Sequence, residues 1–157
     1  MKPEEFINQE TQISIDKEGT WFYNQLPIVN RNIYLFFNKH IEPDDVGGYI
    51  LRIGGETCRL FVEDTPYVVV NVERAAPGSD QEDFFTIRLN DETEEKLDLE
   101  TFYISSSNIP YCRVKKQRFP ARFLRSAYYS LAHHIHQGAD ERFYFLINKK
   151  KHIVRYA

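Results

Sequence analysis

The chain has 157 residues, of which 42% are hydrophobic, 27% charged and 15% aromatic. A chain of this length suits one domain or two small subdomains that share a core, and such a core needs neither a metal nor a disulfide for stability. The overall charge of −3 argues against a domain that is basic throughout, as many nucleic-acid-binding domains are.

The charge is divided unevenly along the sequence. Residues 1–100 contain 9 Lys and Arg against 21 Asp and Glu, a balance of −12, whereas residues 101–157 contain 11 against 2, a balance of +9. The basic part must face acid, either in the chain itself or on an external anion. We therefore expect an acidic, β-rich subdomain with one helix over residues 1–100 and a basic αβ subdomain over residues 101–157, together forming one compact unit.

The apolar segments and the cysteines indicate in which cellular compartment the protein is located. The N-terminus lacks the apolar stretch of a signal peptide, and no later segment approaches the roughly 20 apolar residues that span a bilayer. Cys58 and Cys112 lie far apart in strand-like runs without a CxxC motif, so reduced core thiols are favoured over a disulfide. The sequence predicts a soluble cytoplasmic protein with no cofactor.

The acidic part predicts mostly strands. Alternating apolar residues predict strands at 13–15, 20–23, 49–53, 58–62, 67–72 and 84–89. A helix begins after Asn30, a favourable N-cap, and ends by Pro43. Residues 74–82 predict a loop. Residues 91–100 predict an exposed sheet edge whose Leu97 and Leu99 face inward.

The basic part repeats the order strand, helix, strand. We expect a strand at 111–114, a helix that starts near Pro120 and carries Leu124, Tyr128, Leu131 and Ile135 on its inner face, and strands at 142–147 and 152–156. The same order occurs around residues 20–53. This predicts an α+β fold of two fused, similarly built halves, each strand–helix–strand with an antiparallel β meander. Ordinary reuse of this unit in α+β proteins explains the pattern equally well.

Three stretches carry a resemblance to a known family. They are residues 15–23 (IDKEGTWFY), residues 62–70 (VEDTPYVVV), and residues 110–114 with 121–129 (PYCRV and ARFLRSAYY). In this order they resemble the bacterial family catalogued as domain of unknown function 1285, over roughly residues 13–140. The resemblance implies an α+β fold of two related halves and a signalling or interaction role, and it brings no catalytic residues.

Cations gather around the late helix. The candidate ligand-binding residues are Arg113, Lys115, Lys116, Arg118, Arg122 and Arg125. In the first turns of a helix that starts at Pro120, Arg122 and Arg125 are opposed by the macrodipole and need an acidic partner. The preferred interpretation pairs this stretch with Asp91 to Glu100 or with Glu63 and Asp64. The alternative is an anion-binding patch in which Arg side chains grip phosphate or carboxylate.

Catalytic patterns are weak. His133, His134 and His136 have no zinc-protease spacing, and no metal site is expected. Trp21 is expected to pack where the first helix docks on the sheet.

The leading hypothesis is a non-catalytic regulatory or interaction module that binds a small anionic ligand or an acidic protein surface. Nucleic acid is disfavoured because the acidic part would repel a polyanion. The alternative is an enzyme acting on a small anionic metabolite, with a histidine from the late helix and an acid from Glu63–Asp64. The oligomeric state stays open.

Overall fold

The computed structural model describes residues 7, 8, 10–75 and 82–157. These residues form a mixed α+β fold of two helices and short strands in several sheets, which confirms the predicted fold class. Most of the loop predicted at 74–82 lies outside the described residues.

The chain divides into two compact units, Met1–Pro66 and Tyr67–Ala157. The change of charge near residue 100 therefore falls inside the second unit. That unit contains 14 Lys and Arg against 12 Asp and Glu. The acidic segment and the basic segment within it therefore nearly balance each other in charge.

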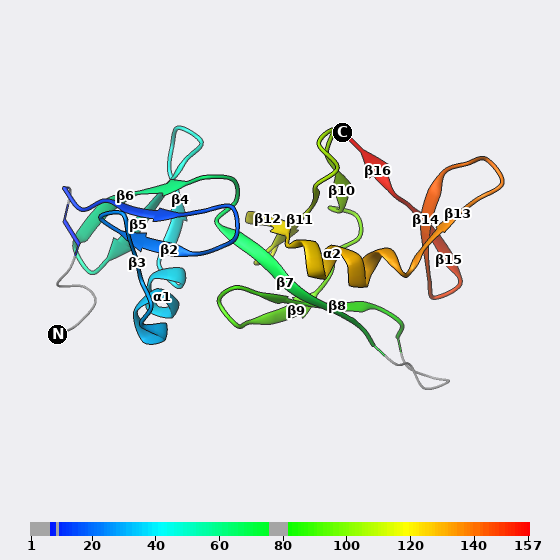
Figure 1. The fold of residues 1–157 in the computed structure, drawn as a ribbon, viewed down its shortest axis with the longest axis horizontal. Helices are drawn as coiled ribbons and strands as arrows, with labels where there is room; N and C mark the ends of the chain where they lie inside the picture. The colour runs from blue at the N-terminus through cyan, green and yellow to red at the C-terminus, as the bar shows by residue number, and fades with distance from the viewer. Residues whose placement is uncertain (1–6, 9, 76–81) are drawn as a thin grey trace. The chain divides into compact units, whose positions relative to one another are not determined.

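The first unit is one six-stranded sheet with a helix (Figure 1). The strand order is β3-β2-β1-β6-β5-β4, and all neighbours are antiparallel except β1 and β6, which are parallel. Its elements are β1 (Ile13–Ile15), β2 (Trp21–Tyr23), β3 (Leu26–Pro27), α1 (Arg31–Asn38), β4 (Ile41–Pro43), β5 (Tyr49–Ile53) and β6 (Glu56–Val62).

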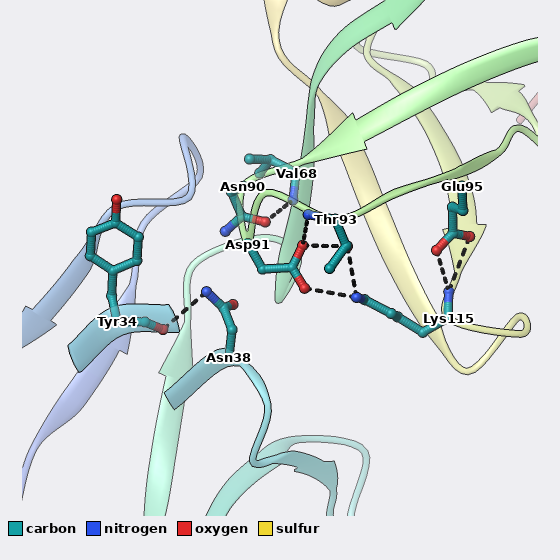
Figure 2. Close-up of polar contacts among 8 residues, drawn as sticks. All are labelled: Tyr34, Asn38, Val68, Asn90, Asp91, Thr93, Glu95 and Lys115. Atoms are coloured by element: carbon teal, nitrogen blue, oxygen red, sulfur yellow. Dashed lines mark hydrogen bonds and ion pairs between the residues drawn. The ribbon is translucent and has the colours of Figure 1, made fainter. Parts of the chain in front are cut away.

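Helix α1 begins where the sequence indicates but ends earlier. The Asn30 side chain caps it by accepting a hydrogen bond from the Ile33 N–H at 3.2 Å. At the other end, the buried Asn38 amide donates to the Tyr34 carbonyl at 3.1 Å (Figure 2). The helix stops at Asn38 because residues 41–43 pair with β5 as strand β4.

Trp21 lies where it was expected. Its side chain is 2% exposed, and its ring lies 5.9 Å from the ring of Phe37 in α1. The prediction that Trp21 packs against the first helix is confirmed.

The second unit contains a seven-stranded sheet of order β16-β10-β11-β12-β7-β8-β9 and a three-stranded sheet of order β13-β14-β15. Strand β9, which lies in the acidic run at 91–100, forms one edge of the seven-stranded sheet, as predicted. Leu97, the residue after β9, is buried. The elements are β7 (Tyr67–Arg74), β8 (Phe85–Leu89), β9 (Glu94–Lys96), β10 (Tyr103–Ile104), β11 (Pro110–Val114), β12 (Phe119–Phe123), α2 (Arg125–Ala132), β13 (Ile135–Gln137), β14 (Phe143–Ile147), β15 (Lys150–Ile153) and β16 (Arg155–Tyr156).

The prediction that the late helix starts near Pro120 is wrong. Residues Phe119–Phe123 form strand β12, with buried residues at every second position, and α2 begins at Arg125. Pro120 is tolerated because the pairing of β12 with β7 begins only at Ala121. On its other side Pro120 lies opposite Arg113, whose N–H donates to the Thr101 hydroxyl and not to β12. The helix also ends at Ala132, and Ile135 belongs to strand β13.

Aromatic rings form the centre of the second unit. Phe102 packs edge-on against Phe123 and Phe145, each with ring centroids 5.5 Å apart, and Phe145 packs on Phe85 at 5.6 Å. Phe145 belongs to the three-stranded sheet, so these contacts attach that sheet to the core of the larger one.

Both cysteines are buried and free, as predicted: Cys58 in β6 and Cys112 in β11. Burial raises the pKa of each thiol, which keeps both protonated at neutral pH.

The two units share only a coarse order of elements. Each has an antiparallel three-stranded meander, a helix and a second such meander, namely β1–β3, α1 and β4–β6 in the first and β10–β12, α2 and β13–β15 in the second. In the first unit the two meanders join through β1 and β6, whereas in the second they lie in separate sheets. The simpler prediction of strand–helix–strand halves is not reproduced in detail.

Among the described residues, no helix has the length and apolar character needed to cross a membrane.

Candidate functional site

The six predicted cations are distributed between the two ends of the β11–β12 hairpin. Arg113, Lys115, Lys116 and Arg118 lie at or near its turn, where Val114 pairs with Phe119. Arg122 lies at the other end of the hairpin, where it pairs with Tyr111. Arg125 follows as the first residue of α2. The predicted patch is therefore two separate groups of cations.

At the turn, Lys115 is held inside an acidic network (Figure 2). Its ammonium group donates to the Asp91 carboxylate at 2.7 Å and to the Thr93 hydroxyl at 2.9 Å. Its backbone N–H donates to both oxygens of the Glu95 carboxylate at 3.2 Å. The side chains of Asp91 and Lys115 are 8% and 27% exposed, so this ion pair is largely shielded from water. The predicted pairing with the acidic run at 91–100 is confirmed for Lys115.

The turn itself needs these partners. Lys115, Lys116 and Gln117 all have positive φ angles, of 56°, 59° and 64°, a conformation that costs roughly 1–2 kcal/mol per non-glycine residue. Arg113 stabilises it by donating to the Gln117 and Arg118 carbonyls, each at 3.1 Å. The Gln117 amide donates to Asp98 at 2.6 Å.

The remaining two cations of the turn differ. The Arg118 guanidinium lies over the Phe119 ring, 5.2 Å from its centroid. Lys116 is exposed and makes no ion pair in the part of the chain that the structure describes. At this end of the hairpin the cations therefore serve mainly to hold the turn.

The other end of the hairpin opens into a pocket of ≈400 Å³, called here the α2 pocket. The turn between β10 and β11 forms one side, where the Ser105 hydroxyl accepts from the Ile109 N–H at 3.2 Å and the Asn108 N–H donates to the Ser105 carbonyl at 2.8 Å. The start of α2 forms the other side. The lining residues are Ser107, Asn108, Ile109, Pro110, Arg122, Phe123, Arg125, Tyr128 and Tyr129.

The start of α2 adds to the positive character of the pocket. Leu124 occupies the N-cap position and provides no side-chain cap, and the first turn contains no acidic residue. The first backbone N–H groups of a helix have no acceptor within the helix and carry partial positive charge. They point towards the end of the helix where Arg125 lies.

The polar side chains that line the α2 pocket are those of Ser107, Asn108, Arg122, Arg125, Tyr128 and Tyr129, all of which can donate hydrogen bonds. None of the described lining residues is acidic, and Arg125 makes no ion pair within the described ranges. The Tyr128 hydroxyl can donate a hydrogen bond, and burial raises its pKa further above neutral pH. Such a lining suits a phosphate or carboxylate group.

The histidines of the late helix do not converge. His133 is the C-cap of α2, and His136 stacks on Tyr144 with ring centroids 5.5 Å apart. His134 lies 3.4 Å from the Arg74 guanidinium and packs edge-on against Phe85. Arg74 is itself ion-paired with Asp83 at 2.6 Å.

The acid proposed for the enzyme alternative is already engaged. The Glu63 carboxylate accepts from the Lys17 backbone N–H at 2.8 Å, within the first unit.

Sequence reasoning missed the other side of the α2 pocket. Residues 107–110 lie near Arg125 only because β10 and β11 form an antiparallel pair beside β12. The SSSN run before Pro110 does signal a turn, but it does not indicate which helix that turn faces.

No family model matches the chain, and no curated protein matches it. Two solved structures are similar, both of DUF1285 family proteins. The one from Silicibacter pomeroyi DSS-3 has a TM-score of 0.75 and 20% identity, and the match covers 94% of this chain and 81% of the other. The one from Shewanella baltica OS155 has a TM-score of 0.63 and 21% identity, covering 79% of this chain and 92% of the other. The chain thus has the fold of DUF1285 family proteins, and the resemblance found in its sequence is confirmed at the level of the fold.

Proposed function

We propose that the chain is a non-catalytic regulatory or interaction module that binds a small anionic ligand in the α2 pocket. The observation that carries this proposal is the composition of the pocket wall. Arg122, Arg125 and the start of α2 line it, and no described acidic residue does. Its volume of ≈400 Å³ lies within the range of small-molecule sites, about 300–1,000 Å³.

The physical basis of binding is charge-assisted hydrogen bonding. An anion in the pocket accepts bonds from the Arg125 guanidinium and gains from the partial positive charge at the start of α2. Each hydrogen bond to a charged group contributes about 1.5–3 kcal/mol, which corresponds to roughly 10- to 100-fold in affinity.

The same wall favours binding over chemistry. General acid–base catalysis is carried out most often by His, and also by Glu, Asp, Lys, Cys or Tyr. Of these residue types the described lining contains only tyrosine, and it contains none of the His, Glu and Asp residues that serve most often.

The test is a titration with inorganic pyrophosphate, followed by calorimetry and by the shift of the melting temperature, because a ligand that binds the native state raises its stability. We expect Arg125→Glu to weaken binding at least 10-fold. Lys116→Glu is the matched control, since it makes the same charge change at an exposed lysine of the same basic stretch but outside the pocket.

The control distinguishes binding at a specific site from attraction by the overall positive charge of the basic part. Equal loss of affinity in Lys116→Glu and Arg125→Glu would show that only the overall charge of the basic part matters, and would contradict the proposal. Binding of a polyglutamate peptide but not of pyrophosphate would assign these cations to an acidic protein surface instead.

A further inference from the structure

The α2 pocket has a second wall that a bare anion does not use. Besides its polar residues, the pocket is lined by Ile109, Pro110, Phe123, Tyr128 and Tyr129. Phe123 and Pro110 are buried and form an apolar floor, whereas Ile109 and Tyr128 are half-buried. Inorganic phosphate bound at Arg125 would leave this surface in contact with water. The wall therefore fits a ligand that carries an apolar part next to its charge.

The position of Tyr129 indicates the shape of that part. Tyr129 is four residues after Arg125 in α2, so the two side chains are neighbours on the same face of the helix. The Tyr129 ring is 59% exposed although it lines the pocket. A large exposed ring beside a guanidinium offers a stacking surface next to an anion contact.

Tyr128 and the turn before β11 limit the remaining space. Tyr128 is three residues after Arg125 and is partly buried, whereas Tyr129 is exposed. Across the pocket, Ser107 and Asn108 are exposed polar residues at the rim. A flat ring between these walls would have apolar contacts on its faces and hydrogen-bonding groups at its edge.

From these walls we infer that the ligand of the α2 pocket is a phosphate joined to a planar aromatic ring, with the phosphate at Arg125 and the ring against Tyr129. This inference rests on the proposed function, because it assigns a ligand class to the same pocket. Nucleotides and aryl phosphates share this chemistry. The base–aromatic contacts of nucleic-acid-binding proteins show that such stacking tolerates different ring systems.

The test compares ligands that differ by one part. Pyrophosphate supplies the anion alone and ribose 5-phosphate the anion with its sugar. Adenosine and cytidine 5′-monophosphate add a base to that sugar, and phenyl phosphate carries an aromatic ring without the sugar. We expect the ring-bearing compounds to bind at least 5-fold more tightly than ribose 5-phosphate in calorimetric titrations. Stronger binding of both nucleotides than of phenyl phosphate would identify a nucleotide, and equal binding would identify an aryl phosphate without readout of the base edge.

Substitutions at Tyr129 locate the stacking surface. Tyr129→Ala is expected to remove the advantage of the ring-bearing compounds and to leave the affinity for ribose 5-phosphate unchanged, whereas Tyr129→Phe keeps the advantage. Phe61→Ala is the control, because Phe61 is an exposed aromatic residue of the first unit, 47% exposed, and does not line the pocket, whereas Tyr156 interacts with the lining residue Tyr128.

The outcomes separate this inference from the proposed function. If ribose 5-phosphate and the nucleotides bind equally and both depend on Arg125, the anion site is correct and the aromatic ligand is wrong. If no anion binds, or if Arg125→Glu changes nothing, both are wrong. An equal effect of Phe61→Ala and Tyr129→Ala on the nucleotides would also overturn the assignment of the ring to Tyr129.

Discussion

The two ends of the β11–β12 hairpin carry the same kind of residue in two different electrostatic settings. At the turn, Lys115 lies among Asp91, Thr93 and Glu95, and its charge is neutralised within the unit. At the other end, Arg125 lines a pocket without an acidic lining residue among those described. The comparison shows that a run of cations in the sequence is not one surface, because each cation acts through its own neighbours in space.

The largest effect is expected at the neutralised end. Lys115→Met leaves the Asp91 carboxylate, 8% exposed, without its cation, and we expect the free energy of unfolding to fall by about 2 kcal/mol. Lys116→Met is the control, because Lys116 has nearly the same φ angle, 59° against 56°, but is exposed. Its effect should stay within about 0.5 kcal/mol.

This experiment should follow urea unfolding by circular dichroism, since Trp21, the single tryptophan, reports on the first unit only. The double variant Lys115→Met with Asp91→Asn should recover part of the loss, because it removes both charges together. Equal effects of Lys115→Met and Lys116→Met would contradict the distinction between neutralised and exposed cations.

A smaller, pH-dependent change in stability is expected at His134. This residue lies beside Arg74, a second cation that is neutralised by an acid, Asp83. Burial and the adjacent Arg74 guanidinium, with further contributions from His133 and His136, lower the pKa of His134, while Asp83 opposes the shift. The folded state therefore binds fewer protons than the unfolded state between the lowered pKa and about 6.5. In that interval stability rises with pH and is lost as the pH falls below about 6.5.

Melting temperatures measured between pH 7.5 and 5 check this prediction. His134→Gln should flatten the dependence on pH, and His133→Gln, at an exposed position, should change it less. The Arg74 hydrogen bond also lowers the pKa of Asp83, so melting temperatures extended to about pH 3 should show a further loss of stability below about pH 4. An unchanged slope in His134→Gln would show that other groups cause the dependence.

The smallest change in stability is expected at the pocket end. Arg125 is exposed in the first turn of α2, where the helix dipole disfavours a cation and favours an anion by about 0.3–1 kcal/mol. Arg125→Glu should therefore leave the unfolding free energy unchanged or raise it slightly, in contrast to Lys115→Met. A loss of more than about 1 kcal/mol would indicate that Arg125 has a structural role.

Local pattern was sufficient for much of the sheet structure. The strand at Phe85–Leu89 alternates apolar and polar residues over its whole length, and residues 51–53 and 58–60 do so within β5 and β6. In all three stretches the burial follows the alternation. The helix at Pro120 was misplaced because Phe119, Ala121 and Phe123 also fit a strand, and proline is typical of a helix start. Pairing with β7 makes residues 119–123 a strand and not a helix. No local sequence pattern reveals that β7 is the neighbouring strand.

The sequence by itself determined the alternation of the strands, the cap of α1 at Asn30, the packing role of Trp21 and the separation of acidic from basic residues. Only the tertiary structure decided which cations meet those acids. Lys115 contacts Asp91, 24 positions earlier, because β9 and the β11–β12 turn converge on it, whereas the same fold places Arg125 beside the turn at 107–110. The physical reason is that ionic contacts act over a few ångströms in space, and distances of that kind are set by strand pairing and not by order along the chain.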